Sequence, residues 1–401
     1  MNILLMSKDI VVMKINFDEG IYDILEPKLL PYQLQGKLVE IPELSESPTK
    51  YEMTQILRAN RKNNIAIEHF LAERVLPITR SNAKKVYSLF GFEQLQSDYE
   101  KAKIAITCRA ISLQDTYWIK NEDDTVTWND VNLRVQPLSE IVAQVSLHGT
   151  SLSLQGHIHT PELNGQGAYA KAWFRENDKL VLHKKGTKGS NESEIEVMVS
   201  NLLDICNVNH VEYKEGNSDG HYVCKCECIT TDDLAILPGL DFYSYCISND
   251  LDFTSEIFKI DSESIYKMWI VDYLISNSDR HGMNWGFFYD SNTMEIKGCH
   301  PLFDHNNAFN EELMKNKDAE YIFDRTKTMK EAALYAMKKV DFHFYRTPER
   351  SDFLTNEQYK SFMDRVKDLN IQIKPQTLDE KISSLSEKHN SHAINKEELT
   401  R

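Results

Sequence analysis

The residues that decide how this chain is interpreted are D-R-H-G-M-N at 279–284 and P-L-F-D at 301–304. The first stretch places an aspartate five residues before an asparagine, and the second ends on another aspartate. The residues between them predict an apolar strand, a polar turn and a returning strand as far as residue 303. Because the strands of a hairpin have their open ends side by side, we expect Asn284 and Asp304 to lie close together.

This spacing is typical of phosphoryl transfer. The reaction needs a carboxylate that orients the attacking hydroxyl, and it needs ligands for the cations that neutralise the phosphates. Protein kinases supply these groups with an Asp-x-x-x-x-Asn loop and a second aspartate downstream. Here Asp279 is placed to orient the hydroxyl, and the oxygens of Asn284 and Asp304 suit Mg²⁺. A solvated loop at a helix end is the alternative interpretation of the first stretch taken alone.

The predicted elements upstream follow the order of a kinase small lobe. A Gly-rich segment precedes a pair of strands, a helix that Asn191 or Ser193 caps, and two further strands. The segment is at 164–168, the strand pair at 170–175 and 180–183 with a turn at 176–178, and the later strands at 210–213 and 221–230.

A lysine and a glutamate from these elements are expected to complete a nucleotide site. A kinase places a lysine on a strand after the Gly-rich loop, pairs it with a helix glutamate and aims it at the phosphates. Lys184 and Glu196 are the preferred pair. Lys185 stays open as an alternative because neighbouring strand residues face opposite ways, and Glu192 is the second choice on the helix.

The Gly-rich segment supplies the third predicted element. Gly165, Gly167 and Lys171 are expected to bind phosphate, since glycines let backbone N–H groups approach phosphate oxygens. A plain turn is the alternative for N-G-Q-G alone. Its position directly before the strand, lysine and helix favours phosphate binding.

The first part of the chain mixes strands and helices. A strand is predicted at 10–15 and a helix at 53–74. The side chains expected to point inward from this helix are Ile56, Ile65, Ile67, Phe70 and Leu71.

Composition and charge exclude several function classes. The chain has 401 residues, of which 41% are hydrophobic and 27% charged, which predicts a globular protein of two or three domains. A formal net charge of −15 repels nucleic acid and anionic lipid. The apolar stretches are too short for a membrane span, and the N-terminus has no signal-peptide pattern. We therefore expect a cytoplasmic protein with no membrane partner and no direct nucleic-acid partner.

The motifs resemble those of the HipA-like Ser/Thr kinases of bacteria. S-N-S-D-R-H at 276–281 with Asn284 is similar to the N-T-D-R-H-x-x-N loop of that family, and P-L-F-D at 301–304 is similar to its metal-binding segment. G-A-Y-A-K-A at 167–172 resembles its phosphate loop. I-S-L-Q-D-T-Y-W-I at 111–119 is similar to a segment that lies upstream of the kinase domain in related members.

The resemblance, which spans residues 110–310, implies an α+β fold. This fold is a two-lobed kinase, with a small β-rich lobe containing one helix and a larger helical lobe, preceded by an N-terminal α/β domain. The expected limits are 1–143 for the accessory N-terminal domain, 144–232 for the small lobe and 233–401 for the large lobe.

The resemblance also implies cofactors, residue roles and partners. The cofactors are ATP and Mg²⁺, with Asp279 as the catalytic base, Asn284 and Asp304 as metal ligands, and Lys184 on the phosphates under the loop at 165–171. Some members are toxins paired with a DNA-binding antitoxin, and one phosphorylates an aminoacyl-tRNA synthetase. The implied partners are therefore a protein substrate, such as a tRNA synthetase or a translation factor, and an antitoxin-type protein.

Members of the family also phosphorylate a serine in the phosphate loop, which switches the enzyme off. We therefore hypothesise a regulatory autophosphorylation site in this chain. The candidate residues are Thr150, Ser151, Ser153 and Thr160.

Three other functions use parts of the same pattern. Phosphoinositide kinases also contain a D-R-H-x-x-N loop, but the acidic net charge and the lack of a basic amphipathic helix argue against a lipid kinase. A non-catalytic nucleotide-binding module has no need to keep the aspartates, the asparagine and the lysine together. His281, Asp304 and His305 also allow a metal-dependent hydrolase, which releases phosphate without labelling an acceptor.

Overall fold

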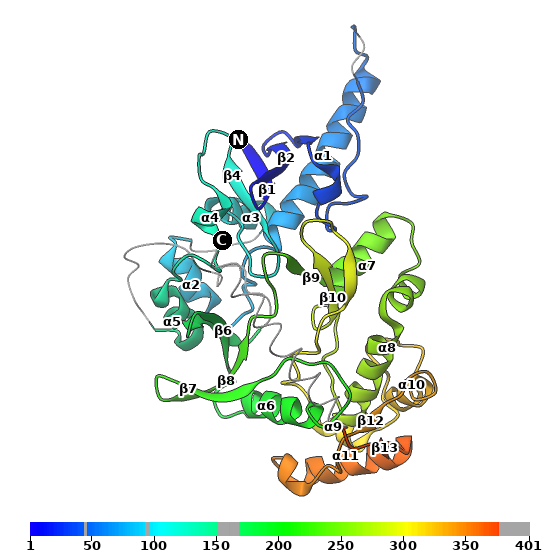
Figure 1. The fold of residues 1–401 in the computed structure, drawn as a ribbon. Coiled ribbons are helices and arrows are strands. Elements are labelled where there is room, and N and C mark those ends of the chain that lie inside the picture. Colours follow the sequence, from blue (N-terminus) through cyan, green and yellow to red (C-terminus); the bar gives the residue numbers. More distant parts are fainter. Residues whose placement is uncertain (44–45, 93–96, 151–159, 161–167, 377–401) are drawn as a thin grey trace.

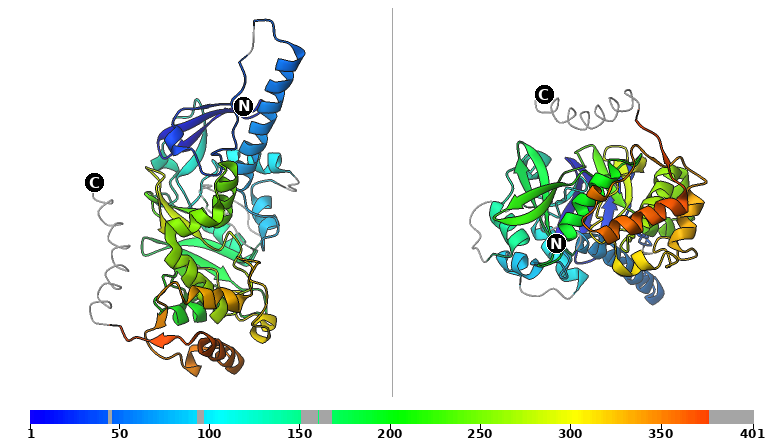
Figure 2. Two further views of the ribbon diagram at one scale, coloured as in Figure 1. Left: turned by 90° about the vertical axis from the view of Figure 1, so that its right-hand side faces the viewer. Right: turned by 90° about the horizontal axis from the view of Figure 1, so that it is seen from below.

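The described part of the chain is a mixed α/β structure built on several small sheets. Figure 2 shows an elongated body with α1 (Lys50–Ala72) at one end and α11 (Asn356–Leu369) near the other. The combination of helices and mainly antiparallel sheets confirms the predicted mixture of α and β structure. The computed structural model describes residues 1–43, 46–92, 97–150, 160 and 168–376.

The N-terminal sheet is antiparallel, with the strand order β3-β2-β1-β4. Helices α1, α3 and α4 lie near it, whereas α2 lies beside the helix Glu140–His148 (Figure 1). Strand β2 confirms the strand predicted at 10–15. The elements are β1 (Asn2–Ser7), β2 (Ile10–Asn16), β3 (Ile21–Ile24), β4 (Tyr117–Asn121), the short helix Pro27–Leu29, α2 (Ala83–Leu89), α3 (Asp98–Thr107) and α4 (Trp128–Val131).

Helix α1 is where the sequence predicted it, but the prediction was wrong for one of the side chains expected to point inward. Ile67, Phe70 and Leu71 are buried, and Ile56 is partly buried. The side chain of Ile65 is 57% exposed instead. Ile65 lies two residues before Ile67, roughly 200° away around the helix, so both cannot face the same core.

The second sheet has the order β5-β6-β8-β7 and lies between two helices. Asn177 and Asp178 both have positive φ, at 50° and 64°, so they form the tight turn predicted between β5 and β6. Helix α5 packs on one face and α6 on the other. The elements are β5 (Ala170–Glu176), β6 (Lys179–Lys185), β7 (Lys214–Ser218), β8 (His221–Glu227), α5 (Glu140–His148) and α6 (Glu192–Leu203).

The strand predicted at 210–213 is wrong, and β7 occupies the four-stranded sheet in its place. The N–H of Val211 donates to the carbonyl of Leu302 at 2.9 Å, and the N–H of Tyr213 donates to Oγ of Ser200 at 2.9 Å. Their partners are therefore a later segment and helix α6. Of the predicted strand, only His210 takes part in a bridge among the described residues, with Leu302.

The third sheet, β11-β10-β9, contains the predicted hairpin. The returning strand ends at residue 299 instead of 303. A register shift interrupts the pairing between Ile296 and Gly298, and the N–H of Cys299 donates to Asp261 at 3.1 Å. Beyond it, Leu302 pairs with the segment around His210. The strands are β9 (Leu234–Pro238), β10 (Gly286–Asp290) and β11 (Ile296–Cys299).

Helix α8 kinks at Asp261, where φ is −157°. The Asp261 carboxylate accepts the N–H of Ser264 at 3.0 Å and so caps the second half of the helix. The remaining elements are α7 (Gly239–Ser248), α8 (Phe253–Leu274), α9 (Glu311–Lys315), α10 (Met329–Ala336), the short helix Arg350–Asp352, β12 (His343–Phe344) and β13 (Gln372–Ile373).

One apolar cluster continues through the N-terminal part and the helical part of the molecule. It contains Leu5 of β1, Leu71 of α1, Leu202 of α6, Val271 of α8 and Phe287 of β10. The N-terminal elements are therefore packed against the rest of the chain rather than merely tethered to it. The predicted domain limits stay a prediction.

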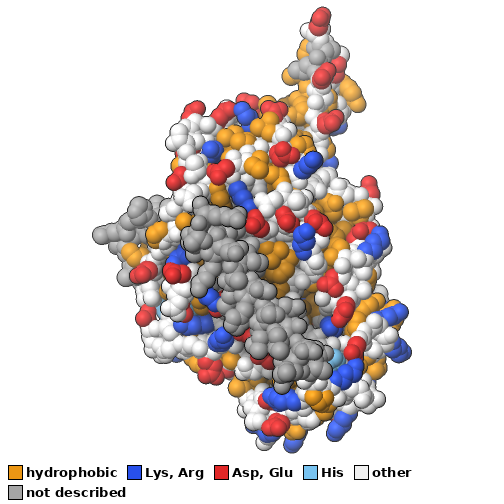
Figure 3. Space-filling view, viewed as in Figure 1, with side chains coloured by type: hydrophobic (Ala, Val, Ile, Leu, Met, Phe, Trp, Pro, Cys, Tyr) orange, Lys and Arg blue, Asp and Glu red, His pale blue; other side chains and the backbone are white. Residues whose placement is uncertain are grey.

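Within the described ranges, no helix is both long and apolar enough to cross a membrane. On the face drawn in Figure 3, basic and acidic side chains are interspersed.

Candidate active site

Lys184 lies at the centre of a buried ion-pair cluster. Its Nζ donates to Oε2 of Glu196 at 2.7 Å and to Oδ1 of Asp304 at 2.6 Å. The Lys184 side chain is 7% exposed, that of Glu196 is 0% exposed and that of Asp304 is 20% exposed. The structure thus brings together a strand lysine, a helix glutamate and a loop aspartate that the sequence singled out separately.

The three charges in this cluster are unequal. Burial opposes the charge on Lys184, but Asp304 and Glu196 outweigh it and raise the pKa of Lys184 well above its usual value. Burial also opposes the Asp304 anion, but Lys184 and Lys171 outweigh it and hold the pKa of Asp304 well below its usual range. Burial raises the pKa of Glu196 despite Lys184. Glu196 is therefore the weaker acid of the two carboxyl groups.

The geometry separates the alternatives that the sequence left open. Lys184, and not its neighbour Lys185, contacts both carboxylates. Glu192 accepts the N–H of Thr187 at 2.8 Å, whereas Glu196 accepts the N–H of His305 at 2.8 Å in addition to its bond from Lys184.

Lys171 faces the same cluster from β5. It lies directly opposite Lys184 in the antiparallel pairing of β5 and β6, so both side chains are on one face of the sheet. Burial lowers the pKa of Lys171 to about 7, with repulsion from Arg80 adding to the effect and the Asp304 carboxylate offsetting part of it. Lys171 is therefore a titratable group next to a permanent cation.

Asp279 sits in a loop that its neighbours hold in place. Its side chain is 34% exposed, and one carboxylate oxygen accepts Nδ2 of Asn307 at 2.8 Å. The amide Nδ2 of Asn284 donates to the Asp279 carbonyl at 2.8 Å and closes the loop. Tyr169 donates its hydroxyl to the Asn307 amide at 3.0 Å, which orients that amide. One carboxylate oxygen is thus held by Asn307, and the other lies 3.6 Å from Nε2 of His281.

The sequence did not single out Asn307 as a functional residue. Its position three residues after Asp304, in the run D-H-N-N at 304–307, is the signal that was available. The sequence also indicated no separate role for Arg280, which appeared only as part of the motif D-R-H-G-M-N.

Arg280 explains why the two aspartate loops converge. Its guanidinium donates to the carbonyl of Asn284 at 2.6 Å and to that of Phe303 at 3.2 Å. It also pairs with Asp272 at 3.0 Å and donates to Nδ1 of His305 at 3.2 Å. One buried side chain therefore ties the loop of Asp279 to the segment that ends at Asp304.

Asp304 has a left-handed backbone, with φ of 60°. This conformation is disfavoured for a residue other than glycine and persists only where the surroundings enforce it. Here the following N–H, that of His305, is bound by Glu196, and the side chain is bound by Lys184. The strain keeps the carboxylate directed at the lysine.

The donor set suits Mg²⁺ bound together with phosphates. Within the described residues, no three His, Cys, Asp or Glu side chains are grouped to hold a metal by themselves. Mg²⁺ in kinase sites is usually held by one or two protein ligands plus substrate phosphates. Asp304 and the side-chain oxygen of Asn284, whose nitrogen is already committed to the Asp279 carbonyl, provide that kind of set.

The cavity beside Lys184 is small. Its volume is about 10 Å³, which is room for roughly one water, and its lining includes Tyr169, Glu196 and Asn306. This cavity, as it stands, is too small to hold a nucleotide. A more open cavity of about 460 Å³ lies between α1 and the end of α7, beside Lys62 and His69, and contains none of the predicted site residues.

Several predicted residues lie outside the described part of the chain. These are Gly165, Gly167, Ser151 and Ser153. Of the other two candidate phosphorylation sites, Thr150 is exposed and Thr160 is buried.

Comparisons with known proteins found likenesses only among solved structures. No protein-family model and no curated protein matches the chain. The Helicobacter pylori proinflammatory kinase CtkA is 17% identical, with a TM-score of 0.37 over 51% of this chain and 90% of that chain. HipA of Shewanella oneidensis MR-1, solved with HipB and operator DNA, is 10% identical, with a TM-score of 0.45 over 97% of this chain and 95% of that chain. Likenesses this distant carry no argument about function.

Proposed function

We propose that this chain is an ATP- and Mg²⁺-dependent protein kinase of the HipA-like type, which transfers a γ-phosphate to a serine or threonine hydroxyl. The observation that carries the proposal is the contact of Lys184 with both Glu196 and Asp304. A kinase needs its strand lysine paired with a helix glutamate and its metal-binding aspartate in place at the same time.

Each residue has a definite task in this proposal. Asp279, held by Asn307, orients the acceptor hydroxyl and takes its proton. Asp304 and Asn284 would hold Mg²⁺, whose charge would neutralise the phosphates of ATP. The ammonium group of Lys184 exchanges its contact with Asp304 for a contact with the phosphates. Glu196 keeps this ammonium group in position. Lys171 adds a second ammonium group on the same face of the sheet.

The hydrolase alternative is not favoured by the geometry. His305 is buried at 1% exposure, and its Nδ1 accepts a bond from Arg280. Burial, together with repulsion from Arg280, lowers the pKa of His305 well below its usual value. Nδ1 of His305 is therefore engaged by Arg280, and within the described residues no three His, Cys, Asp or Glu side chains are grouped to hold the metal ion that a hydrolase needs.

The partners and the location follow as parts of the same proposal. A protein acceptor, such as a translation factor or tRNA synthetase, and an antitoxin-type partner rest on the motif resemblance. Cytoplasmic location rests on the sequence expectation.

The proposal is tested by transfer from γ-labelled ATP with Mg²⁺ to the chain itself or to lysate proteins. We expect Asp279→Asn and Asp304→Asn each to lower the transfer rate on the order of a hundredfold or more, because a positioning carboxylate or a metal ligand is lost. Asp318→Asn, at an exposed aspartate outside the site, is the matched control and should transfer like wild type. Wild-type transfer by either site variant would refute the assignment. Nucleotide binding with no labelling of any acceptor would favour the binding module.

A further inference from the structure

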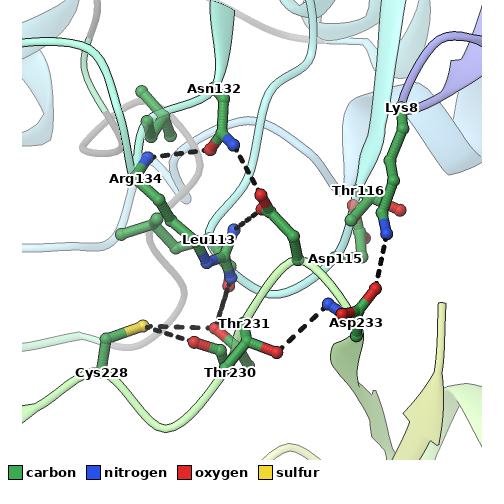
Figure 4. Close-up of polar contacts among 12 residues, drawn as sticks. Lys8, Leu113, Asp115, Thr116, Asn132, Arg134, Cys228, Thr230, Thr231 and Asp233 are labelled. Carbon is green, nitrogen blue, oxygen red and sulfur yellow. Dashed lines mark hydrogen bonds and ion pairs between the residues drawn. The ribbon is translucent and has the colours of Figure 1, made fainter. Parts of the chain in front are cut away.

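Residues 228–233 form the linker between the sheet of Lys184 and the sheet whose hairpin precedes Asp304. The N-terminal part of the chain is hydrogen-bonded to this linker (Figure 4). Nη2 of Arg134 donates to Oγ1 of Thr230 at 2.7 Å, and Nδ2 of Asn132 donates to Oδ2 of Asp232 at 2.8 Å. Both donors follow α4 closely along the chain. These hydrogen bonds to the linker are therefore made by side chains that directly follow α4, a helix that belongs to neither sheet.

A neighbouring backbone segment completes this contact. Arg134 also donates to the carbonyl of Leu113 at 2.8 Å, and the Thr230 hydroxyl donates to the same carbonyl. The N–H of Ile236, just past the linker in β9, donates to the carbonyl of Gln114 at 2.8 Å. The linker and the start of the next strand are thus both fastened to residues 113–114.

A second contact fastens the other end of the linker. Nζ of Lys8, in the turn between β1 and β2, pairs with Oδ1 of Asp233 at 2.8 Å and donates to Oδ1 of Asn292 at 2.8 Å. Nδ2 of Asn292 donates to Asp233 at 2.7 Å, and the N–H of Ser291 donates to the Asp233 carbonyl at 2.9 Å. Lys8 therefore joins the linker to the turn of the hairpin whose open end leads to Asn284 and Asp304.

The N-terminal part also holds the sheet of Lys184 directly. The N–H of Ser81 donates to the carbonyl of Ala168 at 2.9 Å, and Arg80 donates to the carbonyl of Lys171. Lys184 lies in one sheet, and Asp304 follows the hairpin of the other. Both sheets are attached to the N-terminal part of the chain. Connecting segments are usually the mobile parts of a protein, but here Thr230 is only 7% exposed and Arg134 only 14%.

We propose that Arg134 and Asn132 are positioning residues for the nucleotide site. By fixing the linker, they set the angle between the two sheets, so that Lys184 meets Asp304. This inference rests on the kinase function proposed above. Because misplacement of reacting groups by about 1 Å costs on the order of a hundredfold in rate, a small rotation at the linker is enough to impair transfer.

The test compares Arg134→Ala and Asp232→Asn with the matched control Arg109→Ala. Arg109 forms a similar ion pair in the same part of the molecule, 2.7 Å from Asp124, but it does not touch the linker. Hydrogen exchange of the amides at 229–234 should become on the order of tenfold faster in both linker variants, because hydrogen bonds to charged groups are among the stronger ones. The control should exchange like wild type there.

Steady-state kinetics separates positioning from a loss of folded enzyme. We expect the linker variants to raise KM for ATP by about tenfold while KM for the acceptor stays unchanged, since ATP contacts both sheets. A variant that is only less stable lowers kcat in proportion to the active fraction and leaves KM for ATP as it was. If Arg134→Ala does not fold, Asp232→Asn, which keeps the side-chain volume, decides the question.

Two results would overturn the inference. One is unchanged exchange at 229–234 in the linker variants, which needs no activity and so holds even if wild type labels nothing and the kinase proposal fails. The other is faster exchange with both KM for ATP and kcat per folded molecule unchanged. Faster exchange with a raised KM in both linker variants, and neither in Arg109→Ala, supports it.

Discussion

Two buried ion-pair clusters, around Asp272 and around Lys184, are built on opposite plans. Asp272 and Arg280 are both 0% exposed, and every contact of the Asp272 carboxylate is with a donor. Besides Arg280, Asn277 donates to it at 2.9 Å and Tyr321 at 2.8 Å. One anion, one cation and two neutral donors leave this cluster closed and balanced.

The cluster around Lys184 is open and unbalanced. One ammonium group is shared by two carboxylates, and the Asp304 side chain keeps 20% of its surface exposed. The raised pKa of Glu196, caused first by burial, reflects the strain of a second buried anion. The closed cluster around Asp272 therefore holds the two loops together. In the open cluster, which has surplus negative charge, a carboxylate can exchange its contact with Lys184 for a contact with an incoming cation.

The largest expected effect is on stability, at the closed cluster. Arg280→Met leaves the Asp272 carboxylate buried without its cation and should lower the free energy of unfolding by about 3–5 kcal/mol. Arg346→Met is the matched control, because its ion pair with Asp352 is half-exposed at 48% on the arginine side and should be worth about 1 kcal/mol or less. Urea unfolding measures both. Equal losses in the two variants would remove the distinction between closed and exposed pairs.

A smaller stability effect is expected at the open cluster, together with loss of transfer activity. Lys184→Met should cost less than Arg280→Met, because Glu196 can take a proton and Asp304 reaches solvent. Adding Glu196→Gln should restore part of the lost stability by removing one of the two repelling anions. A double-mutant cycle from unfolding curves should give a coupling of about 0.5–3 kcal/mol. If the double variant instead loses more free energy of unfolding than the two single variants together, the two carboxylates do not compete for Lys184.

The balance of these clusters marks the limit of what the sequence predicts. The hairpin between Asn284 and Asp304 and the strand that carries Lys184 follow from local periodicity and turn chemistry, so both could be placed from the sequence. Tyr321 reaches Asp272 across 49 residues, and Asn307 binds Asp279 across 28. No local pattern specifies such pairs, because only the tertiary packing brings them together.

The errors have different origins. Residues 210–213 alternate like a strand, but their partners are helix α6 and the segment at Leu302, which only the tertiary packing brings to them. Ile65 is apolar and lies in a helix, but the part of α1 that packs on the core presents Ile67 and Leu71. Helical periodicity alone places Ile65 and Ile67 on different sides of α1, so this error could have been avoided from the sequence.

The remaining prediction concerns the two lysines that face each other across β5 and β6. Burial lowers the pKa of Lys171 to about 7 from its ordinary 10.5, whereas the pKa of Lys184 is raised well above that value. Between pH 7 and 10.5 the unfolded chain therefore binds more protons at residue 171 than the folded chain, and the contribution of Lys171 to stability rises with pH. Unfolding curves should show this slope in wild type and not in Lys171→Met.

Phosphate charge should reverse that shift, because an anion beside Lys171 favours the ammonium form. ATP with Mg²⁺ should then bind with uptake of a fraction of a proton near pH 8, whereas Lys184, which is already charged, contributes none. Titration calorimetry in buffers of different ionisation enthalpy measures the protons taken up. Lys171→Met should abolish the uptake while the carboxylates remain. The same proton count in wild type and Lys171→Met would place the phosphates away from Lys171 and leave Lys184 as the lysine that meets them.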